Sequence, residues 1–212
     1  MLSITSEFKL RNLLVAVGDG ERGLEIERQR LCSIRDFSLR AAFDRIDRDG
    51  DNHVGPLEVV NFLRDNLVHH VLESEAKNLV QFFDSDTDAR LNFSEFIQIF
   101  LPCEDNVLRN ITIDRPSVRV GRLELLPRDI ELALTTVIEK EIILQRRFES
   151  LKRELQYGLD YTPTAAFRSV DRHSSGTIST VNLGDFLRNN SHFATESELL
   201  AIIRRIDTDG DA

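Results

Sequence analysis

The chain has 212 residues, and its 36 acidic and 27 basic side chains give a net charge of −9. This length is enough for two small domains and a connector, while the acidic balance argues against a nucleic-acid partner. No apolar run reaches the roughly 18 residues that a membrane-spanning helix needs, the N-terminus lacks a secretory pattern, and no membrane partner is expected. The two cysteines, Cys32 and Cys103, lack metal-ligand spacing, so we expect reduced thiols and a cytoplasmic location.

Residues 1–35 predict an N-terminal helical arm. Apolar residues recur at helical spacing on both sides of Gly18-Asp19-Gly20, and we expect these glycines to break the arm into two helices. Ser38 is placed to cap the helix that follows the arm, and Thr162 is placed in the same way before a helix that begins at Pro163.

Residues 47–58 carry oxygen ligands at regular places in a twelve-residue window. Ca²⁺ takes about six to eight oxygen ligands, and a glutamate at the last place of an EF-hand loop supplies two of them. The sixth residue, Asn52, stands where glycine is usual, and asparagine tolerates the left-handed backbone needed there. The expected ligands are the side chains of four residues and the backbone carbonyl of the seventh: Asp47, Asp49, Asp51 and Glu58, with His53.

The pattern returns in residues 84–95, which begin 37 residues after the first loop. One acidic turn could be a solvated surface loop, but two at this separation favour an EF-hand pair over residues 36–101. The apolar eighth-place residues, Val54 and Leu91, are expected to join the loops by a short β-bridge. The ligands expected here are Asp84, Asp86, Asp88 and Glu95, with the backbone carbonyl of Arg90.

Residues 102–128 lose periodicity and contain three prolines, which indicates a linker. Within it, residues 115–120 are basic and partly alternating, so they could be an extended arm for a partner, a kinase site at Ser117, or solvated linker. Residues 129–157 predict a long amphipathic helix with Glu141 among its outward charges. Its apolar stripe either packs on a lobe or is offered to another chain, as in a coiled coil.

Residues 158–212 repeat the first pair at a shift of 124 residues, with Phe43 matched by Phe167 and Asp47 by Asp171. The third loop, residues 171–182, has His173 at the third place and Asn182 at the twelfth, so we expect it to be metal-free or weak. The fourth loop stops at its sixth place, and we expect the natural chain to continue. The weak or incomplete ligands of these loops are Asp171, Ser175, Thr177, Asp207, Asp209 and Asp211.

The two acidic loops resemble those of the calmodulin, troponin C and centrin superfamily. This resemblance implies an all-α fold with two EF-hand pair lobes, Ca²⁺ as the ligand and a protein partner. The duplicated arm and lobe are similar to EF-hand proteins of ciliary and other microtubule-based structures, which implies a place in the cytoskeleton or the axoneme.

No arrangement of catalytic residues is recognisable, and the adjacent His69 and His70 do not face one another on a helix, so we expect no enzyme and no transition-metal site. One hypothesis is a calcium-responsive module that binds a fixed cytoskeletal or axonemal partner through a helix in a groove or a coiled coil. The other is a structural adaptor of a ciliary or microtubule assembly with little switching. The single methionine, Met1, favours one fixed partner, since promiscuous grooves are rich in methionine. A calcium buffer fits poorly, because two of the four loops look inactive.

Overall fold

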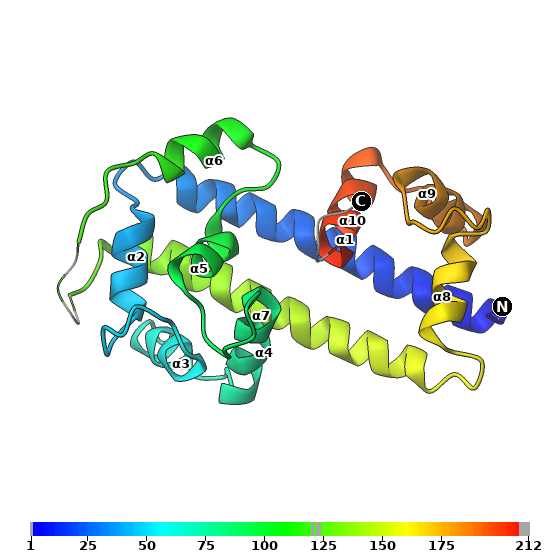
Figure 1. The fold of residues 1–212 in the computed structure, drawn as a ribbon, viewed down its shortest axis with the longest axis horizontal. Helices are drawn as coiled ribbons and strands as arrows, with labels where there is room; N and C mark the ends of the chain where they lie inside the picture. The colour runs from blue at the N-terminus through cyan, green and yellow to red at the C-terminus, as the bar shows by residue number, and fades with distance from the viewer. Residues whose placement is uncertain (1, 120, 122–123, 208–212) are drawn as a thin grey trace. The chain divides into compact units, whose positions relative to one another are not determined.

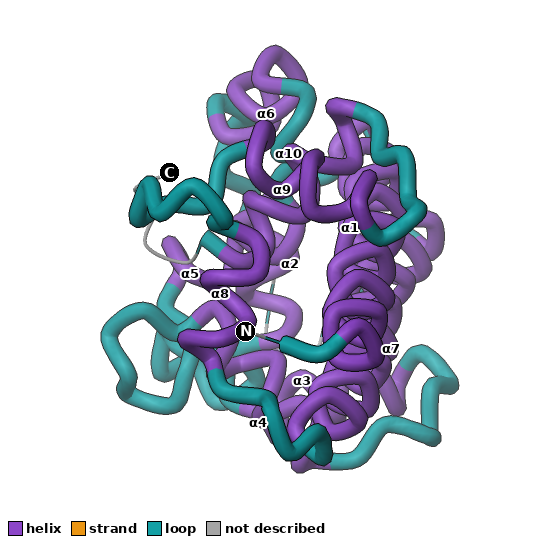
Figure 2. Tube along the Cα trace, turned by 90° about the vertical axis from the view of Figure 1, so that its right-hand side faces the viewer, coloured by secondary structure: helices purple, strands orange, loops and turns teal. Residues whose placement is uncertain are grey.

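Helices make up most of the chain, as its amphipathic segments predict. The computed structural model describes residues 2–119, 121 and 124–207. Figure 2 shows helix and loop over these residues and no strand, which confirms the all-α fold class. None of the described helices combines the length and the apolar character that crossing a membrane requires. The helices are α1 (Ile4–Ser33), α2 (Leu39–Ile46), α3 (Pro56–Asp65), α4 (Glu73–Phe83), α5 (Phe93–Phe100), α6 (Asn106–Ile113), α7 (Arg128–Gln156), α8 (Pro163–Val170), α9 (Thr180–Asn189) and α10 (Glu196–Ile206).

The chain divides into two compact units. Residues 24–145 form the first-lobe unit, and residues 1–23 together with 146–212 form the second-lobe unit. The boundary falls inside α1 and α7, the two long helices of Figure 1. Each unit therefore contains one EF-hand pair and a segment of both long helices.

The core of the first-lobe unit joins helices α2 to α5 with segments of α1 and α7. Phe43 is fully buried, and the rings of Phe93 and Phe96 meet its ring edge-on at centroid distances of 5.5 and 5.1 Å. The apolar stripe of α7 enters the same core, so in this unit the stripe packs on the lobe. Its buried members are Ile130, Leu134, Val137, Ile138 and Ile142.

The prediction that Glu141 faces outward is wrong. Glu141 is fully buried, and its Oε2 lies 3.9 Å from Nη2 of the buried Arg28 on α1. A buried carboxylate needs such a partner because losing its hydration is costly. The partner is 113 residues away in the sequence, beyond the reach of helical periodicity.

The second-lobe unit packs helices α8 to α10 against residues 4–23 of α1 and 146–156 of α7. Buried Arg205 of α10 donates to Glu21 of α1 over 3.4 Å and lies 5.8 Å from the centroid of the Phe148 ring of α7. Near the start of α1, the Ser3 N–H and the Ser6 hydroxyl both donate to Asp160 and lower its pKa to about 2. The unit is thus held together by contacts between residues far apart in the sequence.

The predicted break of the N-terminal arm is also wrong, because α1 continues without interruption from Ile4 to Ser33. A Cβ atom at Gly18 would lie 2.9 Å from Glu198 and 3.0 Å from Ile202 of α10. This glycine serves a close approach between two helices and does not end one. Local sequence cannot separate these two uses of glycine.

Helix ends follow the expected chemistry. Ser38 accepts a hydrogen bond from Ala41 N at the start of α2, and Thr162 accepts one from Ala165 N at the start of α8, as predicted. The linker differs from expectation, since it contains α6, capped by Asp105. Arg115 is also held, because its guanidinium donates to the carbonyl oxygens of three residues near the end of α1: Cys32, Ile34 and Phe37. Of the basic segment 115–120, Val120 lies outside the described residues.

Candidate metal sites

The first loop gathers three of its predicted ligands. Carboxylate oxygens of Asp47, Asp49 and Glu58 lie within 4.8 Å of one another. Glu58 stands in the first turn of α3, where its Oε1 accepts from Arg48 N at 2.7 Å and its Oε2 from Gly55 N at 2.8 Å. Burial raises the pKa of Glu58, and these backbone donors offset only part of that rise. The arrangement places several anionic oxygens around one point.

The second loop gathers a different subset. Oxygens of Asp84, Asp86 and Asp88 lie within 4.8 Å of one another. The twelfth-place Glu95 is held beside them, with the N–H and hydroxyl of Ser85 donating to its Oε1 and Asn92 N to its Oε2. Burial acts to raise the pKa of Glu95, but these hydrogen bonds outweigh it and the pKa is lowered. The carboxylate is therefore kept anionic, as a cation ligand must be.

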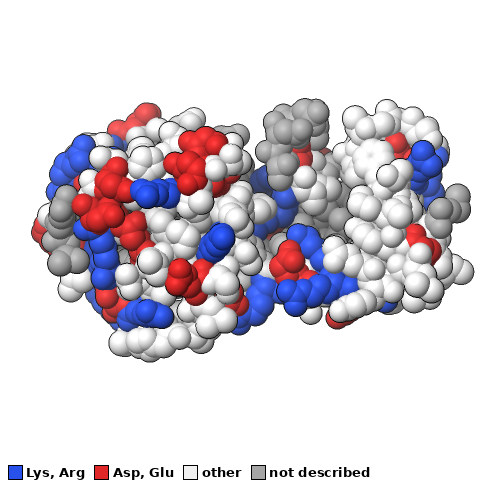
Figure 3. All heavy atoms as spheres, turned by 60° about the horizontal axis from the view of Figure 1, so that its bottom comes forward, with Lys and Arg blue, Asp and Glu red and all other residues white. Residues whose placement is uncertain are grey.

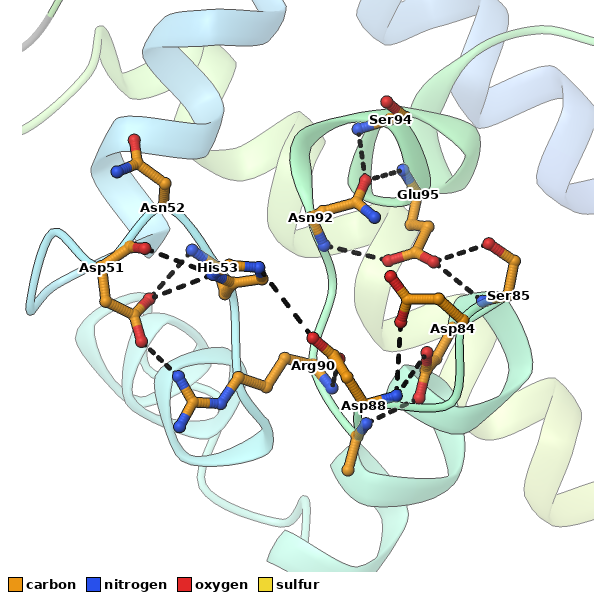
Figure 4. Close-up of polar contacts among 12 residues, drawn as sticks. Asp51, Asn52, His53, Asp84, Ser85, Asp88, Arg90, Asn92, Ser94 and Glu95 are labelled. Carbon is orange, nitrogen blue, oxygen red and sulfur yellow. Dashed lines mark hydrogen bonds and ion pairs between the residues drawn. The ribbon is translucent and has the colours of Figure 1, made fainter.

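The two loops of the first lobe contact each other directly. The predicted bridge is confirmed, with Val54 N donating to Leu91 O at 2.8 Å and Leu91 N to Val54 O at 3.0 Å. The fifth-place Asp51 does not join the cluster of its own loop in the described residues, because its carboxylate forms an ion pair with Arg90 of the other loop (Figure 4). His53 Nε2 lies 3.9 Å from Asp88. Each seventh-place side chain thus faces the fifth-place carboxylate of the neighbouring loop.

The backbone takes the left-handed turn that these loops need. In the first three loops, whose residues the structure describes, the sixth place has positive φ, at +65° for Asn52, +67° for Ala89 and +86° for Gly176. Asparagine and glycine adopt this conformation readily, whereas for alanine it costs about 1–2 kcal/mol. Ala89 therefore carries a local strain that the rest of the second loop must offset.

The third loop satisfies its oxygens internally. The Nδ2 of Asn182, at the twelfth place, donates to the Thr177 carbonyl at 2.7 Å. Asp171 accepts from the N–H groups of Ser175 and Gly176, which lower its pKa. An amide N–H thus occupies the carbonyl that a cation would use. The exposed His173 adds no anionic oxygen at the third place.

We expect that Asn182→Glu alone does not create a strong calcium site in the third loop. The substitution removes the amide N–H, but Asp171 and the new glutamate would be the only carboxylates at the six ligand places. The check is calcium stoichiometry by calorimetry, with a variant that also carries His173→Asp and Ser175→Asp as the positive control. Tight binding of a further ion by the single variant would contradict this expectation.

The fourth loop is described only at its first place. Among the described residues, Asp207 belongs to no group of side chains that could hold a metal ion. It is the C-cap of α10, and its N–H donates to the Ile203 carbonyl. Asp209 and Asp211 lie outside the described residues.

The side-chain roles of Ser85 and Arg90 are not evident from the loop pattern in the sequence. Both sit inside the second loop, yet only the cross-loop register brings Arg90 to Asp51, and only the α5 capping geometry brings Ser85 to Glu95. The pairing of the two loops through their eighth places is the signal that could have placed Arg90 opposite Asp51.

On the face shown in Figure 3, acidic side chains form compact clusters with basic side chains between them.

Comparison with known proteins gives the same assignment. Residues 36–101 match the family model of the EF-hand domain pair. Troponin C isoform 1 of Balanus nubilus is 27% identical over 172 residues, which cover 81% of this chain and 78% of the relative. Troponin C of Tachypleus tridentatus is 27% identical over 81% of both chains, and isoform 2B of Homarus americanus is 26% identical over 82% of this chain and 83% of the relative.

The acidic clusters, the bridge between the loops and these similarities agree with one another. They indicate a protein that binds Ca²⁺ and is not an enzyme. Residues 36–101 are an EF-hand domain pair of the calcium-binding superfamily, and about four fifths of the chain is similar to troponin C.

Proposed function

We propose that the first lobe holds the calcium of this protein, with one ion in each of its two loops. The observation that carries this proposal is the convergence of three carboxylates within 4.8 Å in each loop. The first ion would be held by side chains of the first loop and the carbonyl of His53, and the second by the equivalent groups with the carbonyl of Arg90. The side-chain ligands are Asp47, Asp49, Asp51, Glu58, Asp84, Asp86, Asp88 and Glu95.

The donor set fits calcium. Every proposed ligand is an oxygen, as a hard cation prefers, and the positive φ at Asn52 and Ala89 turns the backbone as the loop requires. A bound ion supplies positive charge that relieves repulsion among the carboxylates. In the first loop, Asp51 must leave Arg90 to reach the ion, so Arg90 competes with calcium for this ligand.

We further propose that the protein acts on a protein partner in the cytoplasm, as a calcium-responsive binding module. Similarity to troponin C over about four fifths of the chain supports a protein-binding role. A fixed cytoskeletal or axonemal partner is favoured by the phenylalanine-rich core and the single methionine. The third and fourth loops, with the arms, would serve attachment.

A static adaptor of a cytoskeletal assembly is the second candidate, and one observation favours it. The apolar stripe of α7 is already buried in the core of the first-lobe unit, where Leu134 and Val137 are fully buried. A lobe whose apolar side is covered has less surface to offer a new helix.

Titration with Ca²⁺ by calorimetry, together with an apolar-surface dye, distinguishes the two candidates. We expect two ions to bind and dye fluorescence to rise as apolar surface becomes exposed. Two ions without new exposure would favour the adaptor. Absence of calcium binding would overturn the proposed sites.

A further inference from the structure

Helix α7 is an integral part of the first lobe. Its residues Ile130, Leu134, Val137, Ile138 and Ile142 are each at most 2% exposed, and all belong to one core cluster with the helices of the EF-hand pair. These positions repeat at three- and four-residue steps, so one face of α7 covers the lobe. The helix occupies the place that an amphipathic target would take in a helix-in-groove complex.

A buried polar contact fixes this helix in place. The carboxylate of Glu131, in the first turn of α7, accepts from Arg45 Nε at 2.8 Å and from Asn66 Nδ2 at 2.7 Å. Leu126 N also donates to it, at 3.1 Å. The side chains of Arg45 and Glu131 are 1% and 4% exposed, so the pair is shielded from water. Asn66 is the C-cap of α3, the helix that leaves the first calcium loop.

Further hydrogen bonds connect Arg45 to the first loop. Arg45 Nη2 donates to Asp65 at 3.0 Å, and Asp65 also pairs with Arg48, the second residue of the loop. The backbone N–H of Arg48 in turn donates to Glu58, the proposed closing ligand. A continuous set of hydrogen bonds therefore joins Glu58 to Glu131.

The internal repeat places a carboxylate at the equivalent point of α1. Glu7 precedes Glu131 by 124 residues, and it pairs with Arg172, which follows Arg48 by 124 residues, at 3.2 Å in the second-lobe unit. In each lobe a glutamate in the first turn of a long helix thus pairs with an arginine, but the arginines are not equivalent: Arg45 of α2 in the first lobe, and Arg172 inside the third loop in the second. The contact in the first lobe differs because Glu131 is buried and bonded to the exit helix.

We propose that residues 128–145 of α7 are the resident, intramolecular target of the first lobe, and that Glu131 is the positioning residue that couples their docking to calcium in the first loop. The inference rests on the proposed function, namely that this loop holds calcium. Rotation of α3 on calcium binding carries Asn66 away from Glu131 and weakens the hold on α7. By linkage, weakening the hold first makes calcium bind more tightly.

The test uses Glu131→Gln in the full chain, with Glu95→Gln added so that calorimetric heat reports the first loop alone. We expect calcium affinity to rise at least about fivefold. Asp129→Asn is the matched control, since Asp129 is exposed in the same turn and loses the same charge. Loss of a negative charge by itself lowers calcium affinity, so the two variants should differ in sign.

A second pair of variants changes no charge. Asn66→Ala removes the bond from the exit helix to Glu131 and should raise calcium affinity in the same way. Asn190→Ala is its control, because Asn190 is the equivalent residue of the second lobe and makes the same bond to a phenylalanine carbonyl. This pair keeps the inference testable if Glu131→Gln does not fold.

Amide hydrogen exchange of residues 128–145 gives an independent readout. We expect calcium to speed exchange there in the unmodified chain and to have less effect in Asn66→Ala. Unchanged exchange with one ion bound, or equal calcium affinities for Asn66→Ala and Asn190→Ala, would overturn this inference alone. A chain that binds no calcium would overturn the proposed function as well.

Discussion

Glu58→Gln is expected to abolish calcium binding in the first loop, and Glu95→Gln in the second, while the fold stays intact. Glutamine keeps the size of the side chain but loses the charge and one of the two anionic oxygens. Ligand charge tunes the affinity of such loops over several orders of magnitude. At Glu58 the loss is compounded, because the amide NH₂ would meet one of two backbone donors, Arg48 N or Gly55 N.

Calcium stoichiometry by calorimetry measures this effect, and circular dichroism checks the helix content. Glu75→Gln is the matched control, since Glu75 bonds the Leu72 N–H at the start of α4 as Glu58 bonds the Gly55 N–H at the start of α3. Glu75 lies outside both loops, so its variant should retain both ions. Unchanged stoichiometry in both loop variants would rule out the proposed ligands.

Phe43→Ala should lower the free energy of unfolding of the first-lobe unit by about 3–5 kcal/mol. Phe43 is fully buried and makes edge-on contacts with two other rings, so its removal leaves a cavity that rigid neighbours cannot fill. The equivalent residue of the second lobe, Phe167, is 37% exposed, and Phe167→Ala should cost clearly less.

Denaturant unfolding at fixed calcium concentration tests this pair. Both tyrosines, Tyr157 and Tyr161, belong to the second-lobe unit, so tyrosine fluorescence follows that unit, whereas circular dichroism follows the whole chain. Phe43→Ala should shift the circular dichroism transition more than the fluorescence transition. Equal losses for the two alanine variants would contradict the difference in burial.

The features predicted correctly from the sequence are those set by short spacing. The caps at Ser38 and Thr162 each depend on residues a few positions apart, and the structure confirms them. The bridge between Val54 and Leu91 joins residues 37 positions apart, but it follows from the eighth place of each twelve-residue loop, and the structure confirms it as well.

The features that were missed depend on distant partners. Gly18 needs α10 to explain why it has no side chain, and Glu141 needs Arg28 to be buried. Helix α6 was missed although its cap, Asp105, is a local signal, because its sequence NVLRNITI is rich in residues of modest helix propensity. Tertiary contacts determine the role of Gly18 and the burial of Glu141, and the periodicity of the sequence does not reveal these contacts.

The first EF-hand pair ends at residue 101 as a sequence motif but continues further as a folded structure. Residues 24–33 and 128–145 supply apolar side chains that complete its core, among them Leu31 and Leu134. A fragment cut at the borders of the motif, residues 36–101, would expose the surface that these segments cover. Such a fragment would aggregate or bind unrelated apolar helices. Its calcium affinity would therefore differ from that of the same lobe in the whole protein.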